Sequence, residues 1–208
     1  LSPNKVLVIY GPRQSGKTTL LRSFLKKTKL RYKLDSGDNI RTQEILSSRD
    51  FPRILEYIST YKLLAIDEAQ RIPNIGMALK IIVDEVPGIK VIATGSSSFD
   101  LSGQIGEPLT GRKRTLTLFP LAQMELVALH NPFELKEKLD EWLIYGSYPA
   151  VVTASTKPEK IEVLEELVNS YLLKDILELE RVKSAKVILD LLRLVAFQVG
   201  NEVSLSEL

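Results

Sequence analysis

One octet of residues constrains this chain more than any other feature: positions 11–18 read GPRQSGKT. The octet fits the pattern G-x-x-x-x-G-K-[ST], and it lies between an apolar, β-branched run at Lys5–Tyr10 and a helical pattern at Lys17–Lys27. Glycines let such a loop bend so that successive backbone N–H groups point inward at a helix N-terminus, where the helix dipole favours an anion. The octet therefore predicts a phosphate-binding loop in an α/β fold. The alternative is a glycine-rich turn that precedes a helix by chance.

The end of the octet supplies the chemistry of a nucleotide site. The Lys17 ammonium is placed to reach the β- and γ-phosphates, and the Thr18 hydroxyl is a hard oxygen ligand for a Mg²⁺ ion that bridges them. We therefore expect a nucleoside triphosphate and Mg²⁺ as cofactors. The expected nucleotide-binding residues form one continuous segment: Gly11, Pro12, Arg13, Gln14, Ser15, Gly16, Lys17, Thr18 and Thr19.

Two adjacent carboxylates end a second apolar run, LLAIDEAQ at positions 63–70. In a Walker-B-like site, Asp67 is expected to hold the Mg²⁺ ion opposite Thr18, and Glu68 is expected to orient and deprotonate the attacking water. A water-activating acid in this position favours hydrolysis over transfer to another acceptor. The alternative is that both acids cap the helix that follows, since acids suit a helix N-terminus.

Hydroxyl side chains cluster after a third apolar run, IKVIATGSSS at positions 89–98. Thr94 and Ser96 lie where they could sense a γ-phosphate or the attacking water, and Thr94 is included among the nucleotide-binding residues. Hydroxyls after a strand also serve in turns and as helix N-caps, so that alternative stays open.

A basic segment, LTGRKRTL at positions 109–116, follows further along the chain. Arg112 comes after a glycine turn and just before the next predicted strand. We expect it to be an arginine finger that stabilises the γ-phosphoryl transition state, from a neighbouring subunit or after closure. Two alternatives stay open: Arg112 is a solvated surface residue, or Arg114 takes the role instead.

Apolar runs alternate with helical patterns up to Phe119, which predicts a parallel sheet with helices on both faces. The predicted strands are Lys5–Tyr10, Arg31–Leu34, Leu63–Ile66, Ile89–Ala93 and Arg114–Phe119, with helices that include Phe51–Ser59 and Ile75–Val86. From Pro120 onward the patterns are helical, at Leu121–His130, Phe133–Tyr145, Pro158–Leu179 and Ala185–Val199. The tail is therefore predicted to be a separate, mostly helical unit.

Composition argues against several other classes of protein. The 28 Lys and Arg residues nearly balance the 26 Asp and Glu residues, so the net charge of +2 gives no broad field for nucleic acid or an anionic membrane. Cys is absent, which removes disulfides and thiolate chemistry and suits the cytoplasm. No apolar run reaches the ~20 residues that cross a bilayer, so we expect a cytoplasmic protein without membrane association. The chain starts without Met, and we interpret it as a fragment.

Five segments together resemble a prokaryotic AAA-type ATPase family over nearly the whole chain: GPRQSGKTTL, LLAIDEAQ, TGSSS, LTGRKRTLTLFPL and YGSYPAVV. The resemblance implies an AAA-type ATPase core at residues 1–122 and a helical lid at 123–182. It also implies that residues 183–208 begin a C-terminal, winged-helix-like domain of unknown function. The implied nucleotide is ATP rather than GTP, a preference that the spacing of the motifs does not contain.

The resemblance also gives a role to the turn at positions 146–149, GSYP, because related ATPases carry a glycine-x-proline turn in the lid that touches the nucleotide base. Tyr148 and Pro149 are the implied adenine contacts. Ser147 departs from the usual double glycine of that turn. The alternative is an ordinary turn between helices.

Together these features predict a Mg²⁺-dependent ATPase that acts as a nucleotide-driven switch or motor, with ATP and ADP as ligands. A homo-oligomer is expected if Arg112 is donated between subunits. The main alternative is an ATP-gated DNA-binding or regulatory protein that contacts DNA through its C-terminal region and has little turnover of its own. A small-molecule kinase would need an acceptor site that the sequence does not locate.

Overall fold

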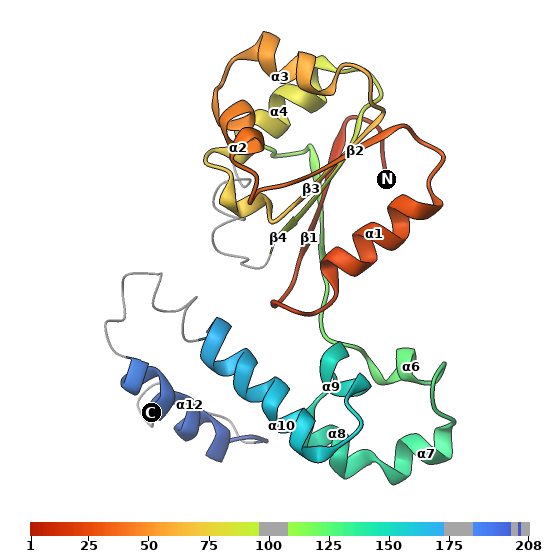
Figure 1. Cartoon of the computed structure of the whole chain (residues 1–208), viewed down its shortest axis with the longest axis vertical. Helices are drawn as coiled ribbons and strands as arrows, with labels where there is room; N and C mark the ends of the chain where they lie inside the picture. The colour runs from red at the N-terminus through yellow and green to blue at the C-terminus, as the bar shows by residue number, and fades with distance from the viewer. Residues whose placement is uncertain (96–107, 173–184, 201–203, 205–208) are drawn as a thin grey trace. The chain divides into compact units, whose positions relative to one another are not determined.

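The computed structural model describes residues 1–95, 108–172, 185–200 and 204 (Figure 1). The chain forms two compact units, Leu1–Leu135 and Lys136–Leu208. The domain boundaries expected after residues 122 and 182 stay predictions.

Five parallel strands form the sheet of the first unit, in the order β2-β3-β4-β1-β5. Their bounds are Lys5–Tyr10 for β1, Tyr32–Ser36 for β2, Leu63–Asp67 for β3, Lys90–Gly95 for β4 and Lys113–Thr117 for β5. The predicted parallel α/β sheet is confirmed, with strand ends that lie within two residues of the predicted ones. Because all pairings are parallel, the five carboxyl ends share one edge of the sheet and the five amino ends share the other.

Helices cover both faces of this sheet (Figure 1). Strand side chains alternate between the faces: Val8 of β1 packs in one cluster of buried residues and its neighbour Ile9 packs in the other. The helix α1, Lys17–Lys27, covers the Ile9 face with Leu21 and Leu25. The opposite face is covered by three helices: α2 at Ile40–Ser47, α3 at Phe51–Ile58 and α4 at Ile75–Glu85.

Two of these helices, α3 and α4, confirm predictions, whereas α2 was not predicted. Only Thr42 and Leu46 of α2 are buried, so its apolar face is too short to give a helical period in the sequence. Asn39 is the N-cap of α2, and its side-chain oxygen accepts a hydrogen bond from the Arg41 N–H at 3.0 Å.

Beyond β5, all the described elements are helices, which confirms the predicted helical C-terminal region. They are α6 at Gln123–Leu126, α7 at Pro132–Glu137, α8 at Leu139–Tyr145, α9 at Pro149–Thr153, α10 at Lys157–Glu166, the π-helical turn η2 at Leu167–Leu172, and α12 at Ala185–Phe197. Thr156 and Glu159 form a capping box at the start of α10. Lys160 of α10 is buried and donates to the Glu141 carboxylate of α8 at 2.6 Å. None of the described helices combines the length and apolar character that a membrane crossing needs.

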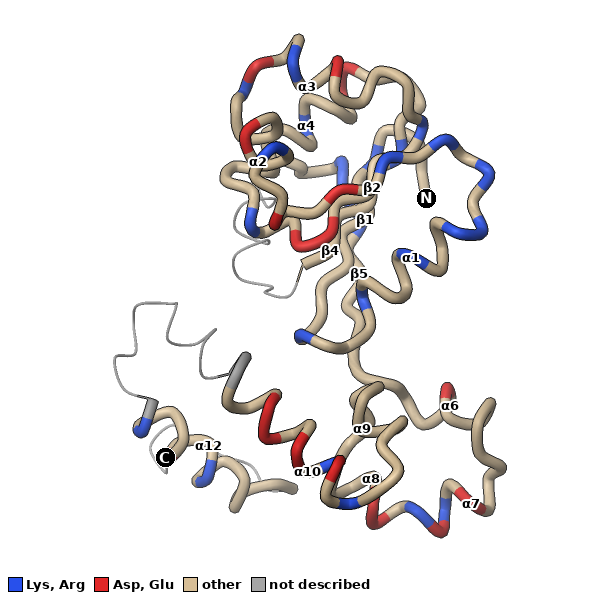
Figure 2. Tube along the Cα trace, viewed as in Figure 1, with Lys and Arg blue, Asp and Glu red and all other residues tan. Residues whose placement is uncertain are grey.

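The two units differ in charge, which the net charge of the whole chain conceals (Figure 2). Residues 1–135 contain 19 Lys and Arg against 13 Asp and Glu, whereas residues 136–208 contain 9 against 13. The excess of positive charge therefore lies in the unit that carries the predicted phosphate loop.

Candidate nucleotide-binding site

The predicted phosphate loop joins β1 to α1 at the carboxyl edge of the sheet. Its glycines are required for two different reasons. A Cβ on Gly11 would lie 2.1 Å from the Leu118 carbonyl oxygen, so only glycine permits this approach of two backbones. Gly16 has a left-handed backbone, with φ of 98°, where it begins α1. Among the described residues, no side chain caps α1 and no acid occupies its first turn, so the positive end of its dipole is left for an anion.

Lys17 lies over this loop. Its Nζ atom donates to the carbonyl oxygens of Gly11 at 2.8 Å and Pro12 at 2.7 Å, and the residue is only 5% exposed. Burial lowers the pKa of the Lys17 ammonium, and the carboxylates of Glu68 and Asp67 oppose that shift. The predicted phosphate-binding cation is thus held beside the loop, with both predicted acids close enough to act on its charge.

Asp67 connects three elements at the carboxyl edge. The Thr18 hydroxyl donates to Asp67 Oδ2 at 2.7 Å, and the Thr94 hydroxyl donates to Asp67 Oδ1. The Glu68 backbone N–H also donates to Oδ1, at 3.2 Å. The structure therefore brings together the start of α1, the end of β3 and the end of β4, with Asp67 opposite Thr18. The expected roles of Thr18 and Asp67 toward Mg²⁺ and of Thr94 toward the γ-phosphate stay predictions.

These oxygens suit a Mg²⁺ ion that arrives with phosphates. Thr18 and Asp67 offer one hydroxyl and one carboxylate, both hard oxygen donors. Within the described parts of the chain, no group of three or more His, Cys, Asp and Glu residues could hold a metal ion. Such a sparse donor set fits Mg²⁺, which is typically bound by one or two protein ligands together with substrate phosphates and water, rather than by an all-protein cage.

Glu68 adopts a left-handed backbone conformation, with φ of 51°, directly after β3. The Gln70 side-chain amide donates to Glu68 Oε2 at 2.6 Å. The short 3-10 helix η1, Ala69–Arg71, follows Glu68 and carries Gln70. The alternative interpretation was that both acids cap the helix that follows. Glu68 lies at the N-cap of η1 but makes no side-chain cap hydrogen bond, and the side chains of the two acids contact Thr18, Thr94 and Gln70.

Gly37 supports this strand end from the neighbouring strand, and sequence reasoning missed it. Its N–H donates to the Asp67 carbonyl oxygen at 2.7 Å. A Cβ on Gly37 would lie 2.1 Å from the Glu68 carbonyl oxygen, so this position tolerates only glycine without a backbone shift. The signal in the sequence was the turn SGDN at positions 36–39, which follows β2, but nothing local indicated which strand it would contact.

A groove of about 530 Å³ opens beside these residues. It is lined at the ends of α1, β2 and β3 by Thr18, Leu21, Arg22, Leu34, Asp35, Ser36, Asp38, Asn39, Asp67 and Glu68. Asp35 is already engaged, because it accepts a hydrogen bond from the Tyr57 hydroxyl at 2.5 Å and pairs with Lys33 at 3.5 Å. Burial and this hydrogen bond raise the pKa of Tyr57. Asp67 and Glu68 line the same groove at the carboxyl edge.

Arg112 lies at the other edge of the sheet. It precedes β5, and its carbonyl oxygen accepts from the Val6 N–H at the amino end of β1. Its Nε atom donates to Asp84 Oδ1 at 2.5 Å. Arg112 is therefore separated from the phosphate loop of its own unit, because the first residues of a parallel strand lie a full strand length from that loop. Its role as an arginine finger, from a neighbouring subunit or after closure, stays a prediction.

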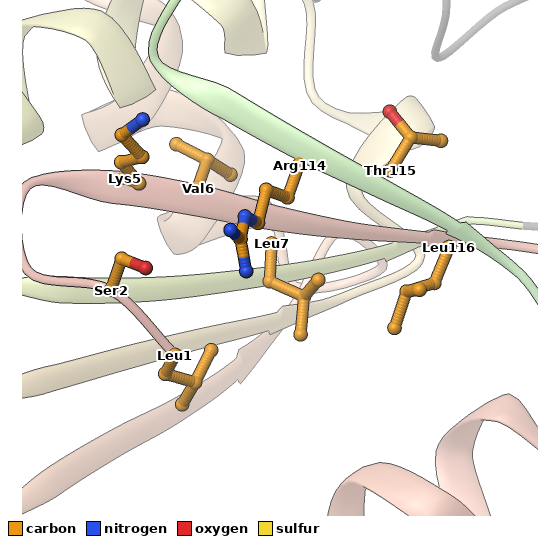
Figure 3. A pocket seen from close by; sticks show the side chains of 8 residues that line it. All are labelled: Leu1, Ser2, Lys5, Val6, Leu7, Arg114, Thr115 and Leu116. Carbon is orange, nitrogen blue, oxygen red and sulfur yellow. The ribbon is translucent and has the colours of Figure 1, made fainter.

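Arg114, the alternative arginine, also lies away from the phosphate loop. It pairs in register with Leu7 in the amino half of β1. Figure 3 shows it among the residues that line a second cavity, of about 460 Å³: Leu1, Ser2, Lys5, Val6, Leu7, Arg114, Thr115 and Leu116. Neither arginine joins Lys17 in the site of the same chain.

The roles of the remaining predicted residues stay predictions. Ser96 lies outside the described residues. Tyr148 and Pro149 belong to the second unit, where Tyr148 precedes α9 and Pro149 is in its first turn. Burial raises the pKa of the Tyr148 hydroxyl. Their predicted contact with adenine therefore stays a prediction, as do the roles of Arg13, Gln14, Ser15 and Thr19 toward a nucleotide.

A glycine-rich loop ending in Lys-Thr, with an acid facing it from a parallel strand, defines a P-loop nucleotide-binding fold. Comparison with known families makes this more specific. The chain belongs to the family described as AAA domain, whose model matches residues 3–127. A second family model, a domain of unknown function, matches residues 136–208. The predicted resemblance to AAA-type ATPases with a C-terminal domain of unknown function is confirmed.

Similar proteins are found in several organisms. An uncharacterized protein of Methanocaldococcus jannaschii is 27% identical over 225 residues, which covers 100% of this chain and 50% of the relative. An uncharacterized protein of Haemophilus influenzae is 24% identical over 231 residues, covering 98% of this chain and 54% of the relative. An uncharacterized ATP-binding protein of Pyrococcus horikoshii is 42% identical over 53 residues, covering 26% of this chain and 16% of the relative. The chain spans about half the length of the first two relatives.

Proposed function

We propose that the chain binds ATP with Mg²⁺ and hydrolyses it at the carboxyl edge of the sheet. The observation that carries this proposal is the 2.7 Å hydrogen bond from Thr18 to Asp67, a hydroxyl and a carboxylate suited to Mg²⁺, at the start of the helix that follows the phosphate loop and begins with the buried Lys17. The AAA domain match and the ATP-binding relative support ATP as the nucleotide. A sheet edge with an inward-facing loop, a cation and a metal pair has the parts that phosphoryl transfer needs.

Each residue has a distinct part in the proposed reaction. The loop N–H groups and Lys17 bind the phosphates, and Lys17 exchanges its bonds to the Gly11 and Pro12 carbonyls for phosphate oxygens. Thr18 and Asp67 would hold Mg²⁺, which neutralises charge on the β- and γ-phosphates when it is bound. Thr94, which is fully buried, fixes the Asp67 carboxylate through its hydroxyl.

Glu68 is the proposed general base. Its carboxylate lines the groove together with Thr18 and Asp67, so water that enters beside the γ-phosphate meets a carboxylate oxygen. Taking a proton from that water as it attacks lowers the barrier, and general-base catalysis typically contributes about 10²- to 10⁴-fold in rate. The proposed base belongs to the first unit, which also carries the phosphate loop.

Glu68→Gln tests the proposal. We expect this variant to bind Mg²⁺-ATP with wild-type affinity in calorimetry and to lose about 10²-fold or more of its hydrolysis rate, since glutamine has the same shape and cannot accept the proton. The rate is measured by phosphate release under single-turnover conditions. Normal hydrolysis by Glu68→Gln would remove Glu68 as the base, and a wild-type protein that takes up no Mg²⁺-ATP would overturn the whole proposal.

The proposed biological role is that of a switch or motor, in which bound ATP holds the core against a lid at residues 123–182 and hydrolysis releases it. In this proposal Tyr148 and Pro149 touch the adenine, and Arg112 is donated to the site of a neighbouring copy in a homo-oligomer. Arg112 would have to leave Asp84 to do so. The location in the cytoplasm and the alternative of ATP-gated DNA binding through residues 183–208 stay predictions.

A mixing experiment tests the donation of Arg112. Lys17→Ala lacks the phosphate cation and Arg112→Ala lacks the finger, so each variant alone is expected to be inactive in an oligomer. If the arginine acts between copies, mixing the two variants restores hydrolysis, because mixed assemblies contain sites with an intact Lys17 and a neighbour's Arg112. A monomer with full activity after Arg112→Ala would reject the role.

A further inference from the structure

Gln70, which was not among the predicted site residues, contacts the proposed base Glu68. Gln70 lies two residues after Glu68, in η1, and its side-chain amide donates to Glu68 Oε2 at 2.6 Å. We propose that Gln70 is a positioning residue, which holds one oxygen of the Glu68 carboxylate and leaves the other to accept a proton from the attacking water. This inference rests on the proposed hydrolysis.

The backbone of Glu68 is fixed independently of Gln70. Its N–H donates to Asp67 Oδ1 at 3.2 Å, and its carbonyl oxygen accepts from the Arg71 N–H at 3.0 Å. That carbonyl oxygen also packs against Gly37, where there is no room for a Cβ. The left-handed backbone at Glu68, uncommon outside glycine, is thus held from several sides. What remains free to rotate is the Glu68 side chain, and the Gln70 amide is the described contact that restricts it.

The contact holds the carboxylate in the site. While it is bonded to Gln70, Glu68 still lines the groove beside Thr18 and Asp67. Gln70 therefore holds Glu68 at the groove rather than sequestering it away from Thr18 and Asp67.

A neutral amide is the appropriate partner for this task. An ammonium or guanidinium would form an ion pair with the carboxylate and reduce its ability to take a proton, whereas an amide N–H fixes the geometry and leaves the charge in place. A carboxylate has about four lone-pair positions on its two oxygens, so one hydrogen bond to Oε2 leaves Oε1 available for water. The arrangement matches that of a base oriented by a third group.

The test compares Gln70→Met and Gln70→Glu with the wild-type chain. Gln70→Met keeps the length of the side chain and removes the donor, and Gln70→Glu keeps its shape and replaces the donor by a second carboxylate. We expect kcat for ATP hydrolysis to fall about 10-fold in Gln70→Met and further in Gln70→Glu, because hydrogen bonds to charged groups carry effects of about this size. The KM and the affinity for Mg²⁺-ATP are expected to stay within about twofold, since a positioning residue acts on the chemical step.

Gln43→Met is the matched control. Gln43 is also partly buried and its amide donates to the Gly37 carbonyl oxygen at 2.5 Å, but it makes no described contact with Glu68. We expect its kcat to stay within about threefold of wild type, because the bond that it loses is not to the charged base.

A double-mutant cycle separates positioning from a merely structural role. In the Glu68→Gln background, adding Gln70→Met is expected to change the residual rate less than about twofold, because there is no base left to orient. Equal losses from Gln70→Met in both backgrounds, or weaker Mg²⁺-ATP binding, would overturn the inference, and so would an unchanged kcat. A faster Gln70→Met enzyme would also overturn it, since Gln70 would then sequester the base. If the wild-type chain binds Mg²⁺-ATP without hydrolysing it, the proposed function fails first and the inference fails with it.

Discussion

Polar side chains are arranged differently at the two edges of the sheet. At the carboxyl edge, hydroxyls and carboxylates from three elements meet within hydrogen-bonding distance, and the Asp67 carboxylate accepts from both Thr18 and Thr94. At the amino edge, basic residues begin or precede the strands, and the described contact of Arg112 is an ion pair with Asp84 on a helix. In a parallel sheet, residues that follow strands share the edge of the phosphate loop and can converge there, whereas residues that precede strands lie at the opposite edge.

The largest expected effect is a difference in Mg²⁺-ATP affinity between one variant at each edge. Lys17→Ala at the carboxyl edge is expected to weaken Mg²⁺-ATP binding by about 10²-fold or more, since the buried Lys17 ammonium is the proposed partner of the phosphates and hydrogen bonds between charged groups are strong. Arg112→Ala at the amino edge removes the same charge and is expected to change the affinity less than about twofold. Isothermal titration calorimetry measures both. Similar losses in the two variants would mean that the edges are not functionally distinct.

The next largest difference is expected in stability when a methyl group is added at each edge by a glycine-to-alanine substitution. Gly37→Ala is expected to destabilise the fold by about 1–3 kcal/mol, because its Cβ would press on the Glu68 backbone carbonyl and one of the two segments must shift. The variant should also lose hydrolysis, since the backbone of the base moves. Chemical denaturation measures the first effect and phosphate release the second.

Gly111→Ala, in the turn before β5, is the control for that substitution. Its Cβ would meet no atom within 4 Å among the described residues, and only the backbone φ of 76° opposes it. We expect a loss of about 1 kcal/mol from this conformational cost, with hydrolysis unchanged. A larger loss at Gly111 than at Gly37 would contradict the close approach of β2 and β3 at the site.

Site residues that local sequence marks differ from those that depend on contacts between distant segments. The phosphate loop, Lys17, Thr18 and Asp67 were predictable because each is marked by local sequence next to a strand or a helix start. Gly37 and Gln70 were not, because one depends on β2 lying beside β3 and the other on the 3-10 turn after Glu68. Both are contacts of the folded chain that no spacing rule contains.

For Arg112, the sequence contained the position but not the role. Arg112 comes just before a strand, so it lies at the amino edge, opposite the phosphate loop, and its role as an arginine finger stays a prediction. The fold class was predictable from alternation of apolar runs and helical patterns, whereas α2 was missed because it buries only Thr42 and Leu46. Where the second unit lies relative to the phosphate loop depends on packing that no local pattern reveals, so the role of Tyr148 could not be derived.

Removing the buried Thr94 hydroxyl at the carboxyl edge is expected to have an intermediate effect on stability and kcat. Thr94→Val keeps the shape of the side chain and removes one of the donors to the Asp67 carboxylate. We expect a loss of stability of about 1–2 kcal/mol and a several-fold lower kcat, because a hydrogen bond to a charged group is lost inside a fully buried position. Thr115→Val on the exposed strand β5 is the control, and surface substitutions of this kind typically stay within about 0.5 kcal/mol. Equal effects at both threonines would show that Asp67 does not depend on Thr94.

The smallest expected effect concerns the stability contribution of the ion pair at the amino edge. Arg112 and Asp84 have side chains that are 42% and 31% exposed, so water and salt screen their attraction even at a separation of 2.5 Å. Arg112→Ala is therefore expected to lower the free energy of unfolding by about 0–1 kcal/mol, and molar salt should reduce the difference further. Urea denaturation at low and high salt measures it. A salt-independent loss above about 2 kcal/mol would mean that Arg112 is a fixed structural residue. An arginine that costs this little to release from Asp84 is free to be donated to another copy, whereas one held that firmly is not.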